Sequence, residues 1–486
     1  MDSVVRTAAG YVRGVIRDGV GAWLGLPYAR AERFAAPEPL DRWTGLRDAL
    51  AAGPQCPQMY GASAKRALVN PPGFAEDCLS LNVHVPDGGA DVGRKPVYVF
   101  IHGGAFVAGS GSAYDGSALA RLGDIVVVTF NYRVGVLGFV NFGAALGAEE
   151  FPSNLGLRDQ IAALAWVRDN IAAFGGDPAR VTVGGQSAGS VSLSLLMLAP
   201  AAKGLFHGAI MKSGAVSLIH DRERSRAVGR RYGEVLGIGP GDGAALRRMD
   251  LRRLFEAQAA VQREMRGGIA AAPWFDGDLV PASLAEAHTH EAACIPLMAG
   301  ATRDEIRLFE LMPGDILPTK WPALTDLLVR QLGREHADRV LAEYPQTKDG
   351  RRALATDLTF AMPTRNFAER HARTCPTWFY RFDYSHFIAG ATHGLDLTLT
   401  WPMAGMRAAL ARGGRMRGKR AALGERIMAH YGHFVRHGAP GPGWPAYTPD
   451  TRATMVFDLD DRIEENPHGA RLDAWAGRDV SPGATV

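Results

Sequence analysis

Residues 181–198 read VTVGGQSAGSVSLSLLML and place one serine at the junction of two hydrophobic patterns. The run from Val181 to Val183 is typical of the end of a buried β-strand, and the leucine-rich run after Ser187 predicts an apolar helix. Between them lies G-x-S-x-G at 185–189, a spacing that arises often by chance in a chain with 58 glycines. Between a strand and a helix, this motif predicts a sharp turn that projects the serine hydroxyl from the sheet. The alternative is an ordinary glycine turn.

The segments around this turn alternate between strand and helix patterns. The runs at 96–104 and 124–133 are nearly continuously apolar, as expected for strands that are covered on both faces. Further strands are predicted at 79–86, 206–214, 295–305 and 376–385, helices at 154–174 and 424–438, hairpins in the first thirty residues, and mainly helical structure over 221–292. This order indicates an α/β fold with a mostly parallel sheet and helices on both faces. The length of 486 residues allows one large domain or about three smaller ones. Because no repeat or linker divides the chain, we expect a single domain over 1–486.

Composition and charge argue against several classes of partner. The chain is 47% hydrophobic and 21% charged, and its net charge of +4 gives no reason to expect nucleic acid or an anionic membrane as partner. The first residues, MDSVVRTAAGYVRGV, contain no apolar core of a secretory signal, and no run of about eighteen apolar residues predicts a membrane span. We therefore expect a cytoplasmic protein that is a monomer or a weak homo-oligomer.

Four cysteines, Cys56, Cys78, Cys294 and Cys375, are present, and no two have C-x-x-C spacing. In a reducing cytosol all four are expected to be free thiols.

A nucleophilic serine requires a base, a group that orients the base, and donors for the oxyanion. The stretch FIHGGAFVAGSG at 100–111 offers such donors, because Gly103 and Gly104 let the backbone bend until N–H groups point into a cleft. Together with the N–H of Ala188 they could hold an oxyanion. A phosphate-binding loop is less consistent with this stretch, since the chain has no G-x-x-x-x-G-K-[ST] pattern.

The acid and the base are expected after the serine, each at the end of a strand. Asp304 and Glu305 both end the strand at 295–305, and spacing does not choose between them. His386 and His393 both follow the strand at 376–385. Glycines bracket His393 closely, which favours it as the base.

Motifs spread over most of the chain resemble the type-B carboxylesterases, the cholinesterase-like branch of the α/β-hydrolases, and within them the bacterial para-nitrobenzyl esterases. The matching stretches include EDCLSLNV (76–83), HGGAF (102–106), NYRVGVLGF (131–139), NLGLRDQIAALAWVRDNIAAFGGDP (154–178), GGQSAGS (184–190), GATRDE (300–305) and GATHGLDL (390–397). The resemblance implies an α/β-hydrolase fold with a large sheet and helical insertions over the active-site cleft.

The resemblance also implies roles for single residues. Ser187, Glu305 and His393 are expected to form the triad, and Gly104, Ala105 and Ala188 to donate to the oxyanion. Gly103 and Ser213 are expected to support the site. It implies no metal and no organic cofactor. It further implies that Cys56 and Cys78, which match a disulfide pair of secreted relatives, lie close together, although we expect them to stay reduced. Two departures from the family, Ile306 after the acid and the segment DLTLTWPM at 396–403, fall where the pocket is expected and leave the substrate open.

The expected function is therefore a serine carboxylesterase acting on small to medium, largely apolar esters. A carbamate or amide hydrolase with the same triad is the near alternative, and a non-catalytic binding protein on this scaffold is disfavoured because all three triad residues are present. The basic stretch 406–420 is expected to be solvated rather than to bind an anionic partner. Three histidines with helical spacing, His430, His433 and His437, are expected to be an ordinary helix face rather than a metal site. Phe106 and Phe309 are either pocket walls or core aromatics.

Overall fold

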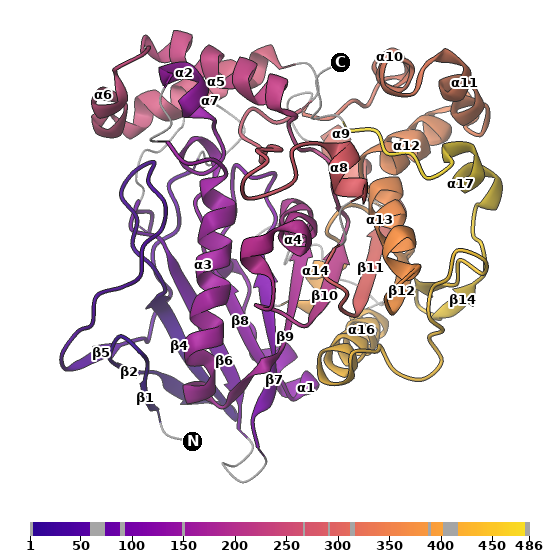
Figure 1. Ribbon diagram of the computed structural model, residues 1–486. Coiled ribbons are helices and arrows are strands. Elements are labelled where there is room, and N and C mark those ends of the chain that lie inside the picture. The colour runs from indigo at the N-terminus through magenta and orange to yellow at the C-terminus, as the bar shows by residue number, and fades with distance from the viewer. Residues whose placement is uncertain are drawn as a thin grey trace.

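The computed structural model describes residues 3–58, 73–87, 93–147, 151–265, 268–289, 292–311, 316–386, 390–401 and 417–481. An eleven-stranded sheet runs through the middle of the molecule (Figure 1) in the order β14-β13-β12-β11-β10-β9-β7-β8-β6-β4-β3. Its strands are β3 (Val15–Arg17), β4 (Val20–Pro27), β6 (Ser80–Pro86), β7 (Lys95–Ile101), β8 (Val126–Phe130), β9 (Gly176–Gln186), β10 (Gly208–Lys212), β11 (Leu297–Thr302), β12 (Thr377–Phe382), β13 (Thr454–Phe457) and β14 (Arg462–Glu464).

The strands from β8 to β13 are parallel, whereas β3, β4, β6 and β14 are attached antiparallel at the two sides. Residues of the central strands β8 and β10 are buried throughout. Such strands need apolar side chains on both faces, which is why the continuous apolar runs predicted them. The predicted, mostly parallel α/β architecture is confirmed.

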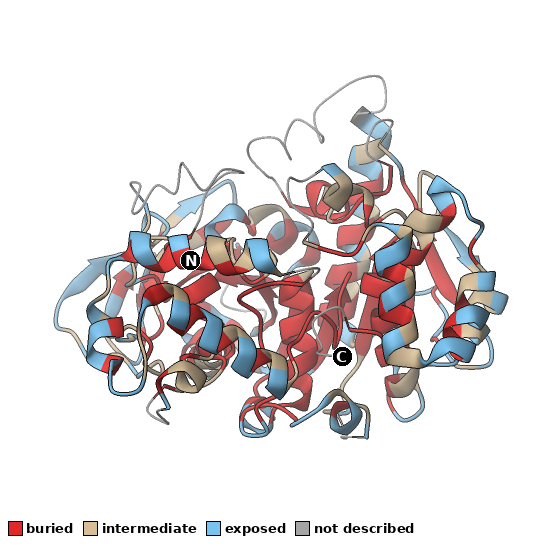
Figure 2. Cartoon of the chain, turned by 90° about the horizontal axis from the view of Figure 1, so that it is seen from above, coloured by how far each residue is buried: buried red, intermediate tan, exposed pale blue. Residues whose placement is uncertain are grey.

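Two hydrophobic clusters cover the two faces of the sheet. Along β7, Val97 and Val99 belong to the larger cluster, whereas Tyr98 and Phe100 belong to the smaller one. Because successive side chains of a strand point to opposite faces, this alternation assigns one cluster to each face. Helices α3 (Leu155–Asn170) and α4 (Ala188–Leu198) contribute to the larger cluster, and α1 (Ser117–Gly123) and α16 (Arg417–His437) to the smaller one. Figure 2 shows the buried strands between helices whose outer sides are exposed.

The remaining helices lie mostly at one end of the sheet, at the top of Figure 1. They are α2 (Phe142–Leu146), α5 (Arg222–Leu236), α6 (Gly243–Arg248), α7 (Leu251–Glu264), α8 (Leu284–Thr289), α9 (Arg307–Leu311), α10 (Trp321–Leu332), α11 (Arg334–Ala342) and α12 (Lys348–Thr356), with α13 (Met362–Ala372), α14 (Leu397–Thr400) and α17 (Gly469–Trp475) beside the sheet. The predicted N-terminal hairpins are confirmed: β1 (Val4–Arg6) pairs antiparallel with β2 (Tyr11–Arg13), which also pairs with β5 (Leu46–Asp48), and β3 pairs with β4.

The expectation of four free cysteines is wrong for two of them. Cys294 and Cys375 form a disulfide, with their Cα atoms 5.5 Å apart, although the two residues are 81 positions apart in the sequence. They precede the parallel neighbours β11 and β12, so sheet pairing brings together two cysteines that no local spacing connects. Cys56 and Cys78 are free, buried and hydrogen-bonded to each other, and this contact together with burial raises the pKa of Cys78.

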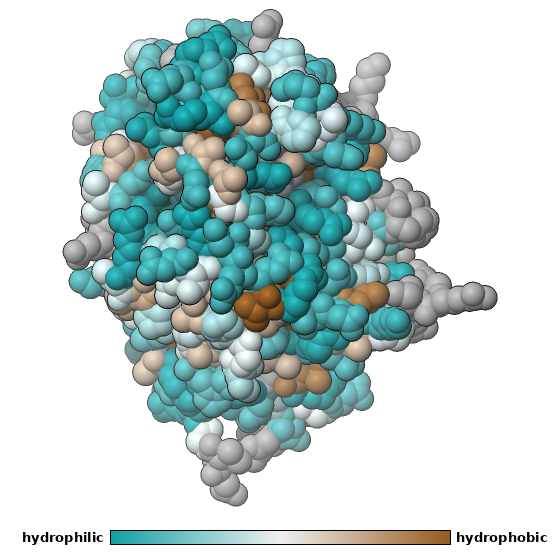
Figure 3. All heavy atoms as spheres, turned by 90° about the vertical axis from the view of Figure 1, so that its right-hand side faces the viewer, coloured by the Kyte–Doolittle hydropathy of each residue, from teal (hydrophilic) through white to brown (hydrophobic). Residues whose placement is uncertain are grey.

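Within the described ranges, every helix is too short or too polar to cross a membrane. The face seen in Figure 3 is largely hydrophilic, and its hydrophobic residues form small, separate spots. On this face we therefore find no broad apolar patch of the kind that marks a membrane or protein contact.

Candidate active site

Ser187 occupies the sharp turn that the sequence predicts between a strand and a helix. It follows β9 and precedes α4, with φ 56° and ψ −126°, a backbone conformation that non-glycine residues adopt rarely. The two flanking glycines are required by space. A Cβ on Gly185 would lie 2.2 Å from the Gly189 carbonyl oxygen, and one on Gly189 would lie 2.1 Å from the carbonyl oxygen of Ile101. The turn is thus strained, closely packed and held in one position, as expected at a functional site.

Glu305 and His393 are brought together from two different loops. Glu305 is fully buried in the loop after β11, and its Oε1 accepts a hydrogen bond from the Thr302 amide at 2.7 Å. Its Oε2 lies 2.5 Å from His393 Nδ1. With Nδ1–H donating to the carboxylate, Nε2 of the neutral imidazole carries the lone pair that can accept a proton.

Asp304, the alternative acid, faces away from this pair. Its Oδ2 accepts a hydrogen bond from the Ala391 amide at 2.9 Å, and its own amide donates to the Ala391 carbonyl oxygen. Asp304 therefore fixes the loop that carries His393 without contacting the imidazole.

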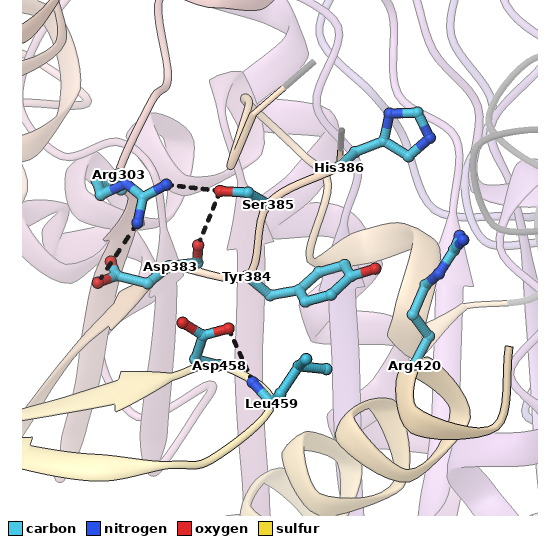
Figure 4. A pocket seen from close by; sticks show the side chains of 8 residues that line it. All are labelled: Arg303, Asp383, Tyr384, Ser385, His386, Arg420, Asp458 and Leu459. Carbon is cyan, nitrogen blue, oxygen red and sulfur yellow. Dashed lines mark hydrogen bonds and ion pairs between the residues drawn. The ribbon is translucent and has the colours of Figure 1, made fainter. Parts of the chain in front are cut away.

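His386, the alternative base, lines a different pocket, shown in Figure 4. Most of its lining residues are polar or charged, and it measures about 310 Å³. Its lining consists of Arg303, Asp383, Tyr384, Ser385, His386, Arg420, Asp458 and Leu459. Burial and the charge of Arg420 lower the pKa of His386. The carboxylate of Glu305 is not part of this pocket, so the geometry favours His393 over His386 as the partner of the acid.

The imidazole and the serine are not hydrogen-bonded to each other in this state. Among the described residues, His393 Nε2 is instead contacted by the side-chain amide of Gln186, whose Nε2 lies 3.0 Å away. Gln186 precedes the serine, and the imidazole also packs against Phe360, which lines the same pocket as Ser187. Catalytic hydrogen bonds are commonly long or unformed without substrate, so this arrangement is compatible with a Ser187–His393 pair. The sequence gives no signal for the Gln186 contact.

The loop at 103–106 packs directly against the serine turn. A Cβ on Gly103 would lie 2.6 Å from the Gln186 carbonyl oxygen and 3.0 Å from Ser187 Cβ. Gly104 has φ 129°, and Ala105 adopts φ 53° although it is not glycine. Within the described chain, the N–H groups of Gly104, Ala105 and Ala188 make no hydrogen bond to protein atoms. Three amide donors are therefore available beside the serine hydroxyl.

An apolar pocket adjoins Ser187. It is lined by Ala105, Phe106, Ser187, Ala188, Leu218, Ile269, Phe309, Ile316, Leu317 and Phe360. Its free space is about 20 Å³, enough for a water molecule but not for an ester. Phe106 and Phe309 both line this pocket, and Phe106, which is fully buried, is also part of the larger hydrophobic cluster. Phe360 was not expected from the sequence; it lies in a single π-helical turn, Asp357–Ala361, and its ring centre is 4.6 Å from that of His393.

Ser213 follows β10, between the strands that lead to the serine and to the acid. Its amide donates to the Gly300 carbonyl oxygen at 2.8 Å, and its backbone has φ 55°. Within the described residues, its hydroxyl makes no hydrogen bond to Glu305 or His393. Among the described residues, Ser213 therefore contacts the neighbouring strand β11 through its backbone amide.

The sequence matches the profile of the Carboxylesterase family over residues 1–475. The chain belongs to the carboxylesterase family. It is 36% identical to the para-nitrobenzyl esterase of Bacillus subtilis (strain 168) over 96% of this chain and 97% of that protein. It is 31% identical to the medium-chain fatty acyl-CoA hydrolase precursor of Anas platyrhynchos, over 94% of this chain and 87% of the relative. A solved structure of a thermophilic PNB esterase superposes with a TM-score of 0.88 at 35% identity, covering 98% of this chain and all of that one.

These similarities establish the fold and the reaction class. The carboxylesterase has the α/β-hydrolase fold and is a carboxylic ester hydrolase of type B. Of the two sequence departures from the family pattern, neither Ile306 nor the described part of the second, 396–401, lines the apolar pocket. Ile306 is fully buried in the larger hydrophobic cluster, and the described part of the second segment, 396–401, packs in the smaller cluster.

No metal-binding cluster is found in the described part of the carboxylesterase. Of the three helix histidines, His430 Nδ1 donates to the Pro440 carbonyl oxygen and His433 Nδ1 to that of Ala439, each at 2.7 Å. The basic stretch lies mostly outside the described residues, which resume at 417. Of its basic side chains, Arg420 lines the pocket of Figure 4.

Proposed function

We propose that this carboxylesterase cleaves small to medium, largely apolar esters with Ser187 as nucleophile, His393 as base and Glu305 as the acid that orients the base. The observation that carries the proposal is the buried contact between Glu305 Oε2 and His393 Nδ1, beside the pocket in which the strained serine turn lies. An acid, a base and a nucleophile in this order are the parts that acyl transfer requires.

In the reaction, His393 Nε2 takes the hydroxyl proton while Ser187 Oγ attacks the ester carbonyl carbon. In the structure the side-chain amide of Gln186 donates a hydrogen bond to His393 Nε2 at 3.0 Å, and this bond has to break before the step. The negative oxygen of the tetrahedral intermediate binds to the three free N–H groups beside the serine, contributed by Gly104, Ala105 and Ala188.

As the intermediate collapses, the imidazolium gives its proton to the departing alcohol, and the acyl group stays on the serine oxygen. A water molecule then attacks the acyl-enzyme, with the imidazole again taking a proton. The products are a carboxylic acid and the free serine. Glu305 stays ionised throughout and stabilises the imidazolium in both halves of the reaction.

The pocket supports apolar substrates. Apart from the serine hydroxyl, its lining side chains are alanine, leucine, isoleucine and phenylalanine. Transfer of a hydrocarbon group from water to such a pocket is favourable by roughly 25 cal/mol for each Å² of apolar surface removed from water. Because the free space is about 20 Å³, the lining has to move apart before an acyl or alkoxy group enters. One relative is named as a medium-chain fatty acyl-CoA hydrolase, and a fatty acyl group is apolar, which agrees with an apolar acyl group in the substrate proposed for this chain.

The test is covalent labelling combined with turnover. A fluorophosphonate probe is expected to attach to one residue, Ser187, identified by mass spectrometry of the digested protein. Labelling and hydrolysis of para-nitrophenyl butyrate should both be lost in Ser187→Ala, and in His393→Ala should fall by about 10⁴-fold or more. Unlabelled, folded protein would refute the proposal. Faster turnover of matched amides or carbamates than of the esters would refute the proposed substrate class.

A further inference from the structure

A buried lysine lies next to the serine turn, and the proposed reaction does not use it. Lys212 is the last residue of β10, and its carbonyl oxygen accepts the hydrogen bond of the Ser187 amide at 2.9 Å. The residue is 1% exposed, and within the described chain its Nζ has no hydrogen-bond partner. The ammonium lies 4.1 Å from the centre of the Tyr431 ring and 5.7 Å from that of Phe100. Aromatic faces attract a cation, but a buried charge is costly unless an opposite charge balances it.

A buried carboxylate supplies that opposite charge. Asp396 follows His393 by three residues and is 2% exposed. Within the described residues, neither of its carboxylate oxygens accepts a hydrogen bond from a side chain. Burial raises the pKa of Asp396 and the charge of Glu305 raises it further, whereas the charge of Lys212 lowers it. Burial lowers the pKa of Lys212 to about 8, and Asp396 is the group that opposes this change.

The other groups that face the pair are neutral phenols. Tyr98 comes from β7, Tyr380 from β12 and Tyr431 from α16, and burial raises the pKa of each of them. Tyr380 and Tyr431 are hydrogen-bonded to each other. The charged groups that act on Asp396 are therefore Lys212 and two members of the proposed triad, Glu305 and His393.

We propose that Lys212 is the counter-ion of Asp396 and a positioning residue for the reaction, because this buried pair balances a second negative charge behind His393. No ion pair within 4 Å joins the two side chains among the described residues. Both side chains nevertheless belong to one apolar region: the Lys212 ammonium packs over Phe100 and Tyr431 of the smaller hydrophobic cluster, and Asp396 lies between Leu395 and Leu397 of the same cluster. In such an interior, electrostatic attraction is several times stronger than in water. With Lys212 present, the imidazolium is stabilised chiefly by Glu305. The inference rests on the proposed function, since it assigns His393 the role of base.

The test compares Lys212→Met, Asp396→Asn and the double variant in the pH dependence of kcat/KM. Removing the lysine leaves an unbalanced carboxylate, which favours the protonated form of His393. The acid limb of the pH profile, where activity falls as His393 becomes protonated, should therefore move to higher pH by about half a unit to one unit. Removing the carboxylate should move the limb to lower pH by a similar amount, and the double variant should return close to the original profile. Lys95 and Asp124 form a matched exposed pair, with Nζ 2.5 Å from Oδ1, and Lys95→Met and Asp124→Asn should leave the limb in place.

Melting temperatures give a second readout that does not depend on catalysis. Breaking a buried pair costs more than removing both partners, so the double variant should melt at a higher temperature than either single variant. The positioning role would be overturned if Lys212→Met and Asp396→Asn moved the acid limb in the same direction. It would also be overturned if their shifts were no larger than those of Lys95→Met and Asp124→Asn. A double variant that melts below both single variants would overturn the pairing itself. If the unaltered protein resists the fluorophosphonate probe, the proposed function fails and the positioning role with it, while the melting temperatures still decide whether Lys212 pairs with Asp396.

Discussion

Replacing Glu305 by glutamine tests whether Glu305 determines which nitrogen of His393 carries the proton. The side chain keeps its length, and the amide oxygen can continue to accept the hydrogen bond from Thr302, now 2.7 Å long. The NH₂ group then takes the place of Oε2, 2.5 Å from His393 Nδ1. Because an amide NH₂ only donates, Nδ1 has to become the acceptor, and the ring proton moves to Nε2. The imidazole is then held in the tautomer that is unable to take a proton from Ser187.

The expected cost follows from this change of tautomer. A carboxylate-to-amide replacement that leaves a triad geometry intact lowers kcat by about 10⁴-fold in serine hydrolases, which corresponds to about 5 kcal/mol of transition-state stabilisation. KM should change little, because Glu305 does not line the apolar pocket. The fold should be retained, because the replacement adds no charge to a fully buried position.

The assay is steady-state hydrolysis of para-nitrophenyl butyrate, with the rate of fluorophosphonate labelling as an independent measure of serine reactivity. Asp304→Asn is the matched control. Its amide oxygen can still accept from the Ala391 amide, so kcat should fall by less than about tenfold. A Glu305→Gln protein that keeps nearly full activity, with a severe loss in Asp304→Asn, would show that the neighbouring carboxylate is the acid and that the reasoning is wrong.

Three further changes have defined outcomes. Gly103→Ala places a methyl group 2.6 Å from a carbonyl oxygen of the serine turn, so kcat should fall by about 10²-fold or more while circular dichroism stays unchanged; full activity would contradict the close packing. Replacing Cys294 and Cys375 together by serine should lower the free energy of unfolding by about 2–4 kcal/mol in urea titrations and leave kcat unchanged, and an equal midpoint with and without reductant would contradict this. Burial lowers the pKa of His102 and of His220 from 6.5 to about 4, so the unfolded state binds more protons and stability is lost as the pH falls from 6.5 through 4. The loss is up to about 3 kcal/mol for each histidine, and His220→Gln should make the measured decline shallower; an unchanged slope would contradict it.

The strands at the centre of the sheet could be predicted from the sequence because burial on both faces makes them continuously apolar. Their order could not be predicted, since β7 lies between β8 and β9 through pairings that no local pattern specifies. The last two strands, β13 and β14, were missed. They have only four and three residues, too few for a repeating pattern, and they are recognised only by the pairing of β13 with β12 and of β14 with β13.

The site divides in the same way between local and distant information. The sharp turn at Ser187 could be predicted because the strand, the small residues and the helix are consecutive. The choice between Asp304 and Glu305 could not be made from spacing, since adjacent residues after a strand turn in different directions, one to the Ala391 amide and the other to His393. The contact of Gln186 with the imidazole joins residues 207 positions apart and leaves no trace in either local sequence.

Strand register explains why residues so far apart in the sequence meet in fixed positions. In the parallel pairs, Lys212 stands opposite Gln186 in β9 and opposite Gly300 in β11. The same register gives the hydrogen bond from the Ser187 amide to the Lys212 carbonyl oxygen and the one from Ser213 to Gly300. A slip of one residue in β10 would turn its buried side chains to the opposite face, moving the lysine from the smaller cluster to the larger one. Correct pairing of these three neighbouring strands therefore fixes together the positions of the serine turn, of the buried lysine and of the start of the loop that carries Glu305.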